Sequence, residues 1–140
     1  MNIVTVPREK LEWSLLALRL GVFIVLVMWA LDKLVNPGHT AAVFKAFYAM
    51  PELSANISYL LGALQLAVVI SFLVGFQKRW VTLAILLMHL GSTLVAIGLY
   101  FDPWSNLLFF AAWPMLAAII ALYLLRDFDT KYSLSKPTVD

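Results

Sequence analysis

The 140-residue sequence contains no cysteine, and only 13% of its residues are charged. Without thiols the chain cannot form a disulfide, hold an iron–sulfur cluster or attach a c-type haem. A soluble domain usually has about 25% charged residues, so the low content excludes a soluble enzyme and a disordered tail. The net charge of +2 gives no footprint for binding to nucleic acid. The sequence also lacks phosphate-binding loops, dinucleotide fingerprints, nucleophile elbows and HExxH motifs.

Long apolar runs dominate instead, and they bring the hydrophobic content to 63%. Each is about 20 residues long, the length that lets a helix cross the hydrocarbon core of a bilayer. Backbone groups in lipid must be hydrogen-bonded within their own segment, so each run is expected to be a helix. The four runs cover approximately residues 13–31, 55–76, 80–100 and 105–125. The sequence therefore predicts an all-α, transmembrane four-helix bundle that forms a single integral membrane domain over residues 1–140.

Basic residues predict the orientation of this bundle. The N-terminal segment, the turn at 76–79 and the C-terminal tail together carry seven Lys or Arg residues, whereas the opposite side carries only Lys33 and Lys45. Cytoplasmic loops are enriched in Lys and Arg. Both termini are therefore expected in the cytoplasm.

The connection between the first two runs is longer than the others and contains a short helix. Thr40 is expected to be its N-cap and Pro51 its end, with the helix over residues 41–50. The helix presents three aromatic side chains: Phe44, Phe47 and Tyr48. This pattern predicts an interfacial helix that covers the outer mouth of the bundle.

Ionisable and amide side chains inside a bilayer are costly, so each is a candidate site residue. Arg19 lies within the first run, either as a structural arginine that reaches headgroups or backbone carbonyls, or as a contact to an anionic or polar ligand. Gln65 and His89 are each twelve residues from Gln77, the centre of a tight turn. Antiparallel neighbours should place them at one depth, as a structural hydrogen bond or as a ligand-binding or proton-handling pair. We predict that Arg19, Gln65 and His89 point inward and bound one polar pocket.

Haem and metal sites are disfavoured by the histidine count. A bis-histidine haem needs two imidazoles on facing helices, and the second histidine, His39, is expected outside the membrane. Met88 or Met115 would be the remaining axial ligands. No metal site is predicted, because such a site needs several convergent ligands.

Two further patterns lie at the ends and on the surfaces of the runs. Asp32 and Lys33 close the first run and Asn106 begins the fourth, so they form either a polar group at the outer mouth or ordinary solvated helix termini. Small residues recur every fourth position in the second run, at Ala63, Ala67, Ser71 and Gly75. Such ridges allow close helix packing.

Several of these motifs together resemble the DoxX-like family of small four-span membrane proteins. They are Leu18-Arg19-Leu20-Gly21, the stretch from Trp29 to Leu34, Pro37-Gly38, Tyr59-Leu60-Leu61-Gly62, Gly75-Phe76 with Lys78-Arg79, and Arg126 to Asp129. The resemblance implies the bacterial inner membrane and a redox setting, since some relatives are described as subunits of thiosulfate:quinone oxidoreductase. Members often carry a glutamate where this chain has Gln65, so a protonatable carboxylate is lost there.

Three functions remain open on this basis. The first is a small membrane subunit of a quinone-linked redox system, without enzymatic activity as an isolated chain and with quinone as the possible ligand. The second is a non-catalytic module that binds or assembles a membrane partner or a second copy of itself through its small-residue ridges. The third is a carrier for a small solute or a metal. In each case the lipid bilayer is a partner and nucleic acid is not.

Overall fold

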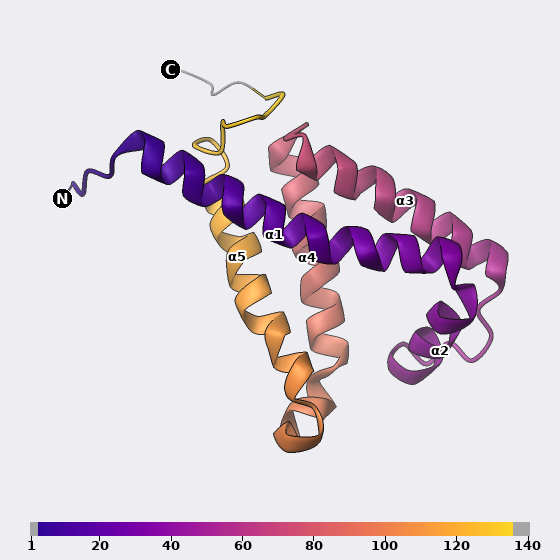
Figure 1. Cartoon of the computed structure of the whole chain (residues 1–140). Coiled ribbons are helices and arrows are strands. Elements are labelled where there is room, and N and C mark those ends of the chain that lie inside the picture. The colour runs from indigo at the N-terminus through magenta and orange to yellow at the C-terminus, as the bar shows by residue number, and fades with distance from the viewer. Residues whose placement is uncertain (1–2, 136–140) are drawn as a thin grey trace.

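The computed structural model describes residues 3–135, and this part of the chain is all-α with no strand (Figure 1). Its five α-helices are α1 (Arg8–Val35), α2 (Pro37–Phe47), α3 (Ala55–Leu73), α4 (Lys78–Val95) and α5 (Ala112–Leu124). Three short 3-10 helices join α4 to α5: η1 (Ile97–Phe101), η2 (Pro103–Ser105) and η3 (Leu107–Ala111). The four expected apolar runs thus correspond to α1, α3, α4 with η1, and η3 with α5.

The long helices form two antiparallel pairs that diverge from a shared end (Figure 1). Helix α1 packs along α3, and α4 packs along α5. Where the pairs meet, α1 also touches α5 and α3 touches α4. The buried core joins all four helices there and consists of Leu15, Val22, Leu26, Val69, Phe72, Ile85, Ile119 and Leu122. The pairs are therefore fixed at one end and leave space between them at the other.

Close packing of α1 on α3 depends on Gly62. A Cβ atom at this position would lie 2.9 Å from both the Lys33 Cβ and the Leu34 Cδ2. The hydroxyl of Ser58, one turn earlier, donates to the Lys33 carbonyl oxygen at 2.8 Å. A glycine and a serine thus let the two backbones approach directly, as small residues do between membrane helices.

The turn between α3 and α4 is as short as the sequence predicts, but the two helices separate beyond it. Gly75 has φ +68° and Gln77 has φ 45°, left-handed conformations that reverse the chain within a few residues. From this turn α3 and α4 run in clearly different directions (Figure 1). The expectation that they stay side by side is therefore wrong, because each packs mainly on another helix.

Three segments are long and apolar enough to cross a membrane: Arg8–Val35, Ala55–Leu73 and Leu107–Leu124. Helix α4 is not among them, because its 18 residues include Lys78, Arg79 and His89. The last apolar segment begins as a 3-10 helix and becomes α-helical at Ala112. Pro114 has no N–H group to donate to the carbonyl four residues earlier, which explains why regular α-helix begins only here.

The short helix after α1 begins earlier than predicted. It starts at Pro37, with Asn36 as its N-cap residue, and it ends at Phe47. Proline is favoured in the first turn of a helix, where no N–H donor is needed. The predicted N-cap role of Thr40 is therefore wrong, and Thr40 lies buried inside the helix.

Candidate functional site

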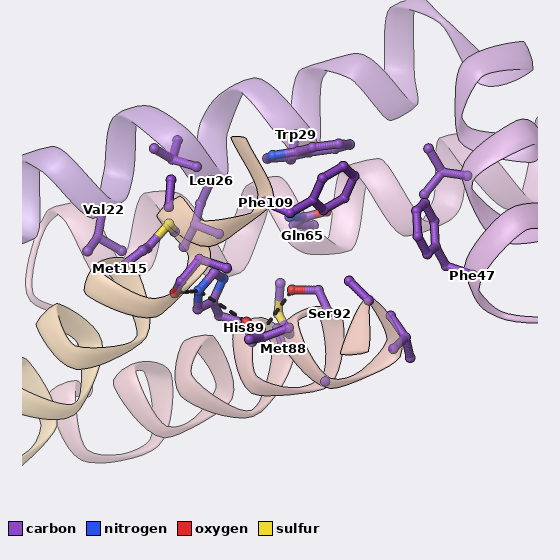
Figure 2. A pocket seen from close by; sticks show the side chains of 18 of the residues that line it. Val22, Leu26, Trp29, Phe47, Gln65, Met88, His89, Ser92, Phe109 and Met115 are labelled. Atoms are coloured by element: carbon purple, nitrogen blue, oxygen red, sulfur yellow. Dashed lines mark hydrogen bonds between the residues drawn. The ribbon is translucent and has the colours of Figure 1, made fainter. Parts of the chain in front are cut away.

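A cavity of about 830 Å³ occupies the space between the two helix pairs. Its wall is mostly aliphatic and aromatic and includes residues of α1, α2, α3, α4, η1, η3 and α5. Figure 2 shows Trp29, Phe109 and Gln65 near its middle, with His89 and Met115 toward one end and Phe47 toward the other. This volume is in the range of sites that enclose small molecules. The cavity contains two of the three predicted polar residues, Gln65 and His89.

The ring of His89 is held by two oxygen atoms. Its Nε2 lies 2.9 Å from the carbonyl oxygen of Ala112 on α5 and 3.4 Å from the Thr93 hydroxyl, one turn along α4 (Figure 2). The Thr93 hydroxyl donates its own proton to the His89 carbonyl at 2.7 Å. Both neighbours can therefore only accept from Nε2, so the proton is on Nε2 and Nδ1 is the unprotonated nitrogen of the neutral ring.

Gln65 lies on α3, across the cavity from α4. Within residues 3–135 the side chain of Gln65 makes no hydrogen bond to His89 or to any other residue. The reason is the divergence of α3 and α4, which opens the cavity between two residues that the sequence places at the same depth. The amide of Gln65 is available to donate to or accept from a molecule in the cavity.

Further polar groups line the cavity that the sequence did not indicate as site residues. The hydroxyl of Thr40 is 3% exposed and has no hydrogen-bond partner in the described part of the chain. Ser92 donates to the His89 carbonyl at 2.9 Å, and Tyr100 donates to the Thr93 carbonyl at 3.3 Å. The spacing of His89 and Thr93, four residues apart on one helix, was the one available signal in the sequence.

Aromatic and charged residues lie at the α2 end of the cavity. The ring of Phe47 on α2 lies 6.0 Å from that of Phe109 on η3, so aromatic side chains extend from this end toward the middle of the cavity. A carboxylate oxygen of Asp32 lies 2.6 Å from the Nδ1 of His39, and Lys33 donates to the Trp29 carbonyl at 3.1 Å.

Of the polar group predicted at the outer mouth, Asp32 and Lys33 line the cavity. Asn106 does not, and its amide donates to the Asp102 carbonyl at 3.0 Å. The structure therefore brings two of these three residues to the cavity and uses the third to hold the loop before η3.

Arg19 is not part of the cavity wall, because its side chain faces the C-terminal segment. It is 1% exposed and donates to the Leu73 carbonyl at 2.8 Å and to the carbonyls of Lys131 and Tyr132. Its Nε also lies 3.3 Å from a carboxylate oxygen of Asp129. The structure thus separates Arg19 from Gln65 and His89, and gives it the carbonyl-binding arrangement of a structural arginine.

The segment that Arg19 binds follows α5 and folds back over the closed end of the helix pairs (Figure 1). Lys78 donates to the Asp129 carbonyl at 2.8 Å, and the Leu134 amide donates to the Val74 carbonyl at 2.8 Å. Burial raises the pKa of the Asp129 carboxyl, and the charges of Arg19 and Lys78 offset part of that rise. Arg19 therefore organises the end of the molecule where the helices converge.

Residues 11–104 match the family model described as methylamine utilisation protein MauE. The long apolar helices and this match define an integral membrane protein. The chain belongs to the MauE family, which is related to the DoxX-like small membrane proteins. Neither curated proteins nor solved structures gave a match. The matched range includes Gln65, His89 and Thr40, and it ends before η3 and α5.

Proposed function

We propose that this chain is a small membrane subunit of a quinone-linked redox system and that its cavity holds the head of a quinone-type ligand between Gln65 and His89. The observation that carries the proposal is the cavity itself: an apolar space of about 830 Å³ with an amide and an imidazole on opposite walls. A quinone head is a flat, mostly apolar ring with polar oxygens at opposite edges. Pockets of this kind orient a ligand through a few placed polar groups.

The family supports a redox setting for this ligand. Its description names methylamine utilisation, and the step that fits a membrane protein is the maturation of methylamine dehydrogenase. A chain with no cysteine takes part in no thiol–disulfide exchange of its own. Its contribution to maturation is therefore proposed to come through the bound ligand and through contact with partner proteins.

The proposal includes four membrane spans, with α4 as a span beside α1, α3 and α5, in a bacterial inner membrane. Antiparallel packing of α4 on α5 supports this, because a partner of a spanning helix must cover the same depth. Both termini then lie in the cytoplasm, as the basic residues predict. A fluorescent reporter at the C-terminus should be active and alkaline phosphatase at the same point inactive. The opposite pattern would overturn the proposed topology.

Titration with a short-chain ubiquinone tests the proposed ligand. Trp29 lines the cavity, so binding should quench its fluorescence in protein reconstituted into lipid nanodiscs. In a Trp29→Phe variant the same titration should show no saturable quenching. Only the gradual, unspecific decrease in the fluorescence of the other tryptophans should remain. Absence of saturable quenching in the unmodified protein, together with no heat of binding, would contradict the proposal.

A second function, assembly of a membrane partner, is favoured by the apolar and small side chains that the structure leaves exposed. Apolar side chains of the loop between α4 and α5 are strongly exposed: Phe101 by 85%, Trp104 by 84% and Leu108 by 90%. Ala63 and Ala67 of the small-residue ridge also face outward on α3. If assembly is the function, crosslinkers at Trp104 and Ala67 should capture one defined partner or a second copy, and emptying the cavity should have no effect on that capture.

A further inference from the structure

We infer that the cavity prefers the reduced, hydroxyl-bearing form of its ligand, because His89 presents a hydrogen-bond acceptor to it. The inference rests on the proposed function, and it specifies which redox state of a quinone-type molecule this site binds more tightly. It follows from the proton position on one imidazole ring and from the partners of that ring.

The position of the proton on the His89 ring is fixed by two protein oxygens. A carbonyl oxygen has no proton to give, so the 2.9 Å contact with the Ala112 carbonyl requires a proton on Nε2. The Thr93 hydroxyl oxygen lies 3.4 Å from the same nitrogen, and its proton is used in a hydrogen bond to the His89 carbonyl. Moving the proton to Nδ1 would bring a lone pair on Nε2 against two oxygens. The fold therefore stabilises one tautomer.

The Nδ1 atom of His89 can consequently accept a hydrogen bond. It has no hydrogen-bond partner within residues 3–135, and the ring lines the cavity. The ring of a quinone offers only acceptor oxygens, which cannot donate a proton to this nitrogen and would repel its lone pair. A hydroquinone offers an O–H group, which donates to it. An unmatched polar group in an apolar site costs about 1–3 kcal/mol, so the hydroxyl form should bind about 5–150 times more tightly.

The uncharged polar groups of the cavity do not oppose this preference. The Gln65 amide and the unpartnered Thr40 hydroxyl each both donate and accept, so either redox form satisfies them. His39 does not line the cavity, and the two charged residues that do, Asp32 and Lys33, lie at its α2 end, where Asp32 contacts His39 and Lys33 donates to the Trp29 carbonyl. At the end of the cavity that His89 lines, the discrimination between the two forms is therefore assigned to His89.

Calorimetry of a matched ligand pair tests the inference. Decylubiquinol and decylubiquinone are titrated anaerobically into the protein in nanodiscs, alongside His89→Gln and Gln65→Leu variants. We expect the quinol to bind at least about fivefold more tightly to the unmodified protein. His89→Gln should reduce that ratio toward one, because the glutamine amide can turn either its NH₂ donor or its oxygen acceptor toward the ligand. Gln65→Leu should weaken both forms and leave the ratio unchanged.

Each other outcome overturns a definite statement. Equal binding, or tighter binding of the quinone, refutes the preference and leaves the proposed function standing. A ratio that survives His89→Gln refutes the role of His89. If neither form binds, the proposed function itself is refuted.

If the His89→Gln variant does not fold, ¹⁵N NMR of the unmodified protein tests the role of His89 instead. His39→Ala assigns the signals, and the Nδ1 resonance of His89 should move with the quinol and not with the quinone.

Discussion

Replacing Arg19 with alanine is expected to destabilise the protein by about 3–5 kcal/mol, the loss typical when one partner of a buried ion pair is removed. The substitution would leave the Leu73, Lys131 and Tyr132 carbonyls without their donor and the Asp129 carboxylate without its nearest charge. The C-terminal segment should detach from the ends of α1 and α3. Thermal unfolding in detergent and limited proteolysis of the segment after α5 would measure both effects.

Arg8→Ala is the matched control for this change. Arg8 is on the same helix and also pairs with a carboxylate, that of Glu12 at 2.7 Å, but its side chain is 78% exposed. Exposed ion pairs contribute little to stability, so this variant should unfold at nearly the same temperature as the unmodified protein. Equal stability of the two variants would contradict the structural role of Arg19.

The loss of stability in the Arg19→Ala variant should become smaller as the pH is lowered. Burial raises the pKa of Asp129, and Arg19 offsets part of this rise. Without the guanidinium the pKa of Asp129 in the folded state rises further above its unfolded value. The folded variant then binds a proton more readily than the unfolded chain, so lowering the pH through this window should restore part of the stability.

Filling the cavity with Gly21→Leu should reduce quinone affinity at least about tenfold, a loss of roughly 1.4 kcal/mol. Gly21 lies on the face of α1 that also carries Leu18, Val25 and Trp29 to the cavity. A Cβ atom at Gly21 meets nothing within 4 Å, so a side chain can begin here without a clash, and we expect the rest of the leucine to occupy ligand space. The same Trp29 quenching titration measures the change.

Gly98→Leu provides the control for the cavity-filling variant. Gly98 also has nothing within 4 Å of an added Cβ, and it does not line the cavity. This variant should bind the short-chain ubiquinone as the unmodified protein does. Full affinity in Gly21→Leu, with unfolding unchanged, would show that the ligand does not occupy this cavity.

The sequence predicted the helical elements well because their signals are local. Apolar length identifies α1, α3 and α5, and the tight turn at 76–79 follows from Gly75 and its neighbours. The start of α2 was missed because Thr40 is a good capping residue, while Pro37 in the first turn was the stronger determinant. The divergence of the helix pairs was not predictable, since it depends on contacts such as Gly62 against Lys33 that join distant segments.

The candidate site shows the same division between local and long-range information. Depth along each helix could be counted, and it places Gln65 and His89 at the same cavity. The direction in which each side chain points could not be obtained from residue spacing. The partner of His89 is a backbone carbonyl on α5, and the partners of Arg19 lie more than fifty residues away in the turn region and the C-terminal segment. Backbone carbonyls carry no sequence signature, so the sequence offered carbonyl contacts for Arg19 as one alternative but could not identify the partner residues of either side chain.

Native mass spectrometry of the protein extracted from its own membrane tests the central claim most directly. The account predicts a bound quinone in the unmodified protein, confirmed by its mass after lipid extraction, and its loss in the Gly21→Leu variant but not in Gly98→Leu. An unmodified protein that carries only phospholipid, or that retains its quinone when the cavity is filled, would contradict the account.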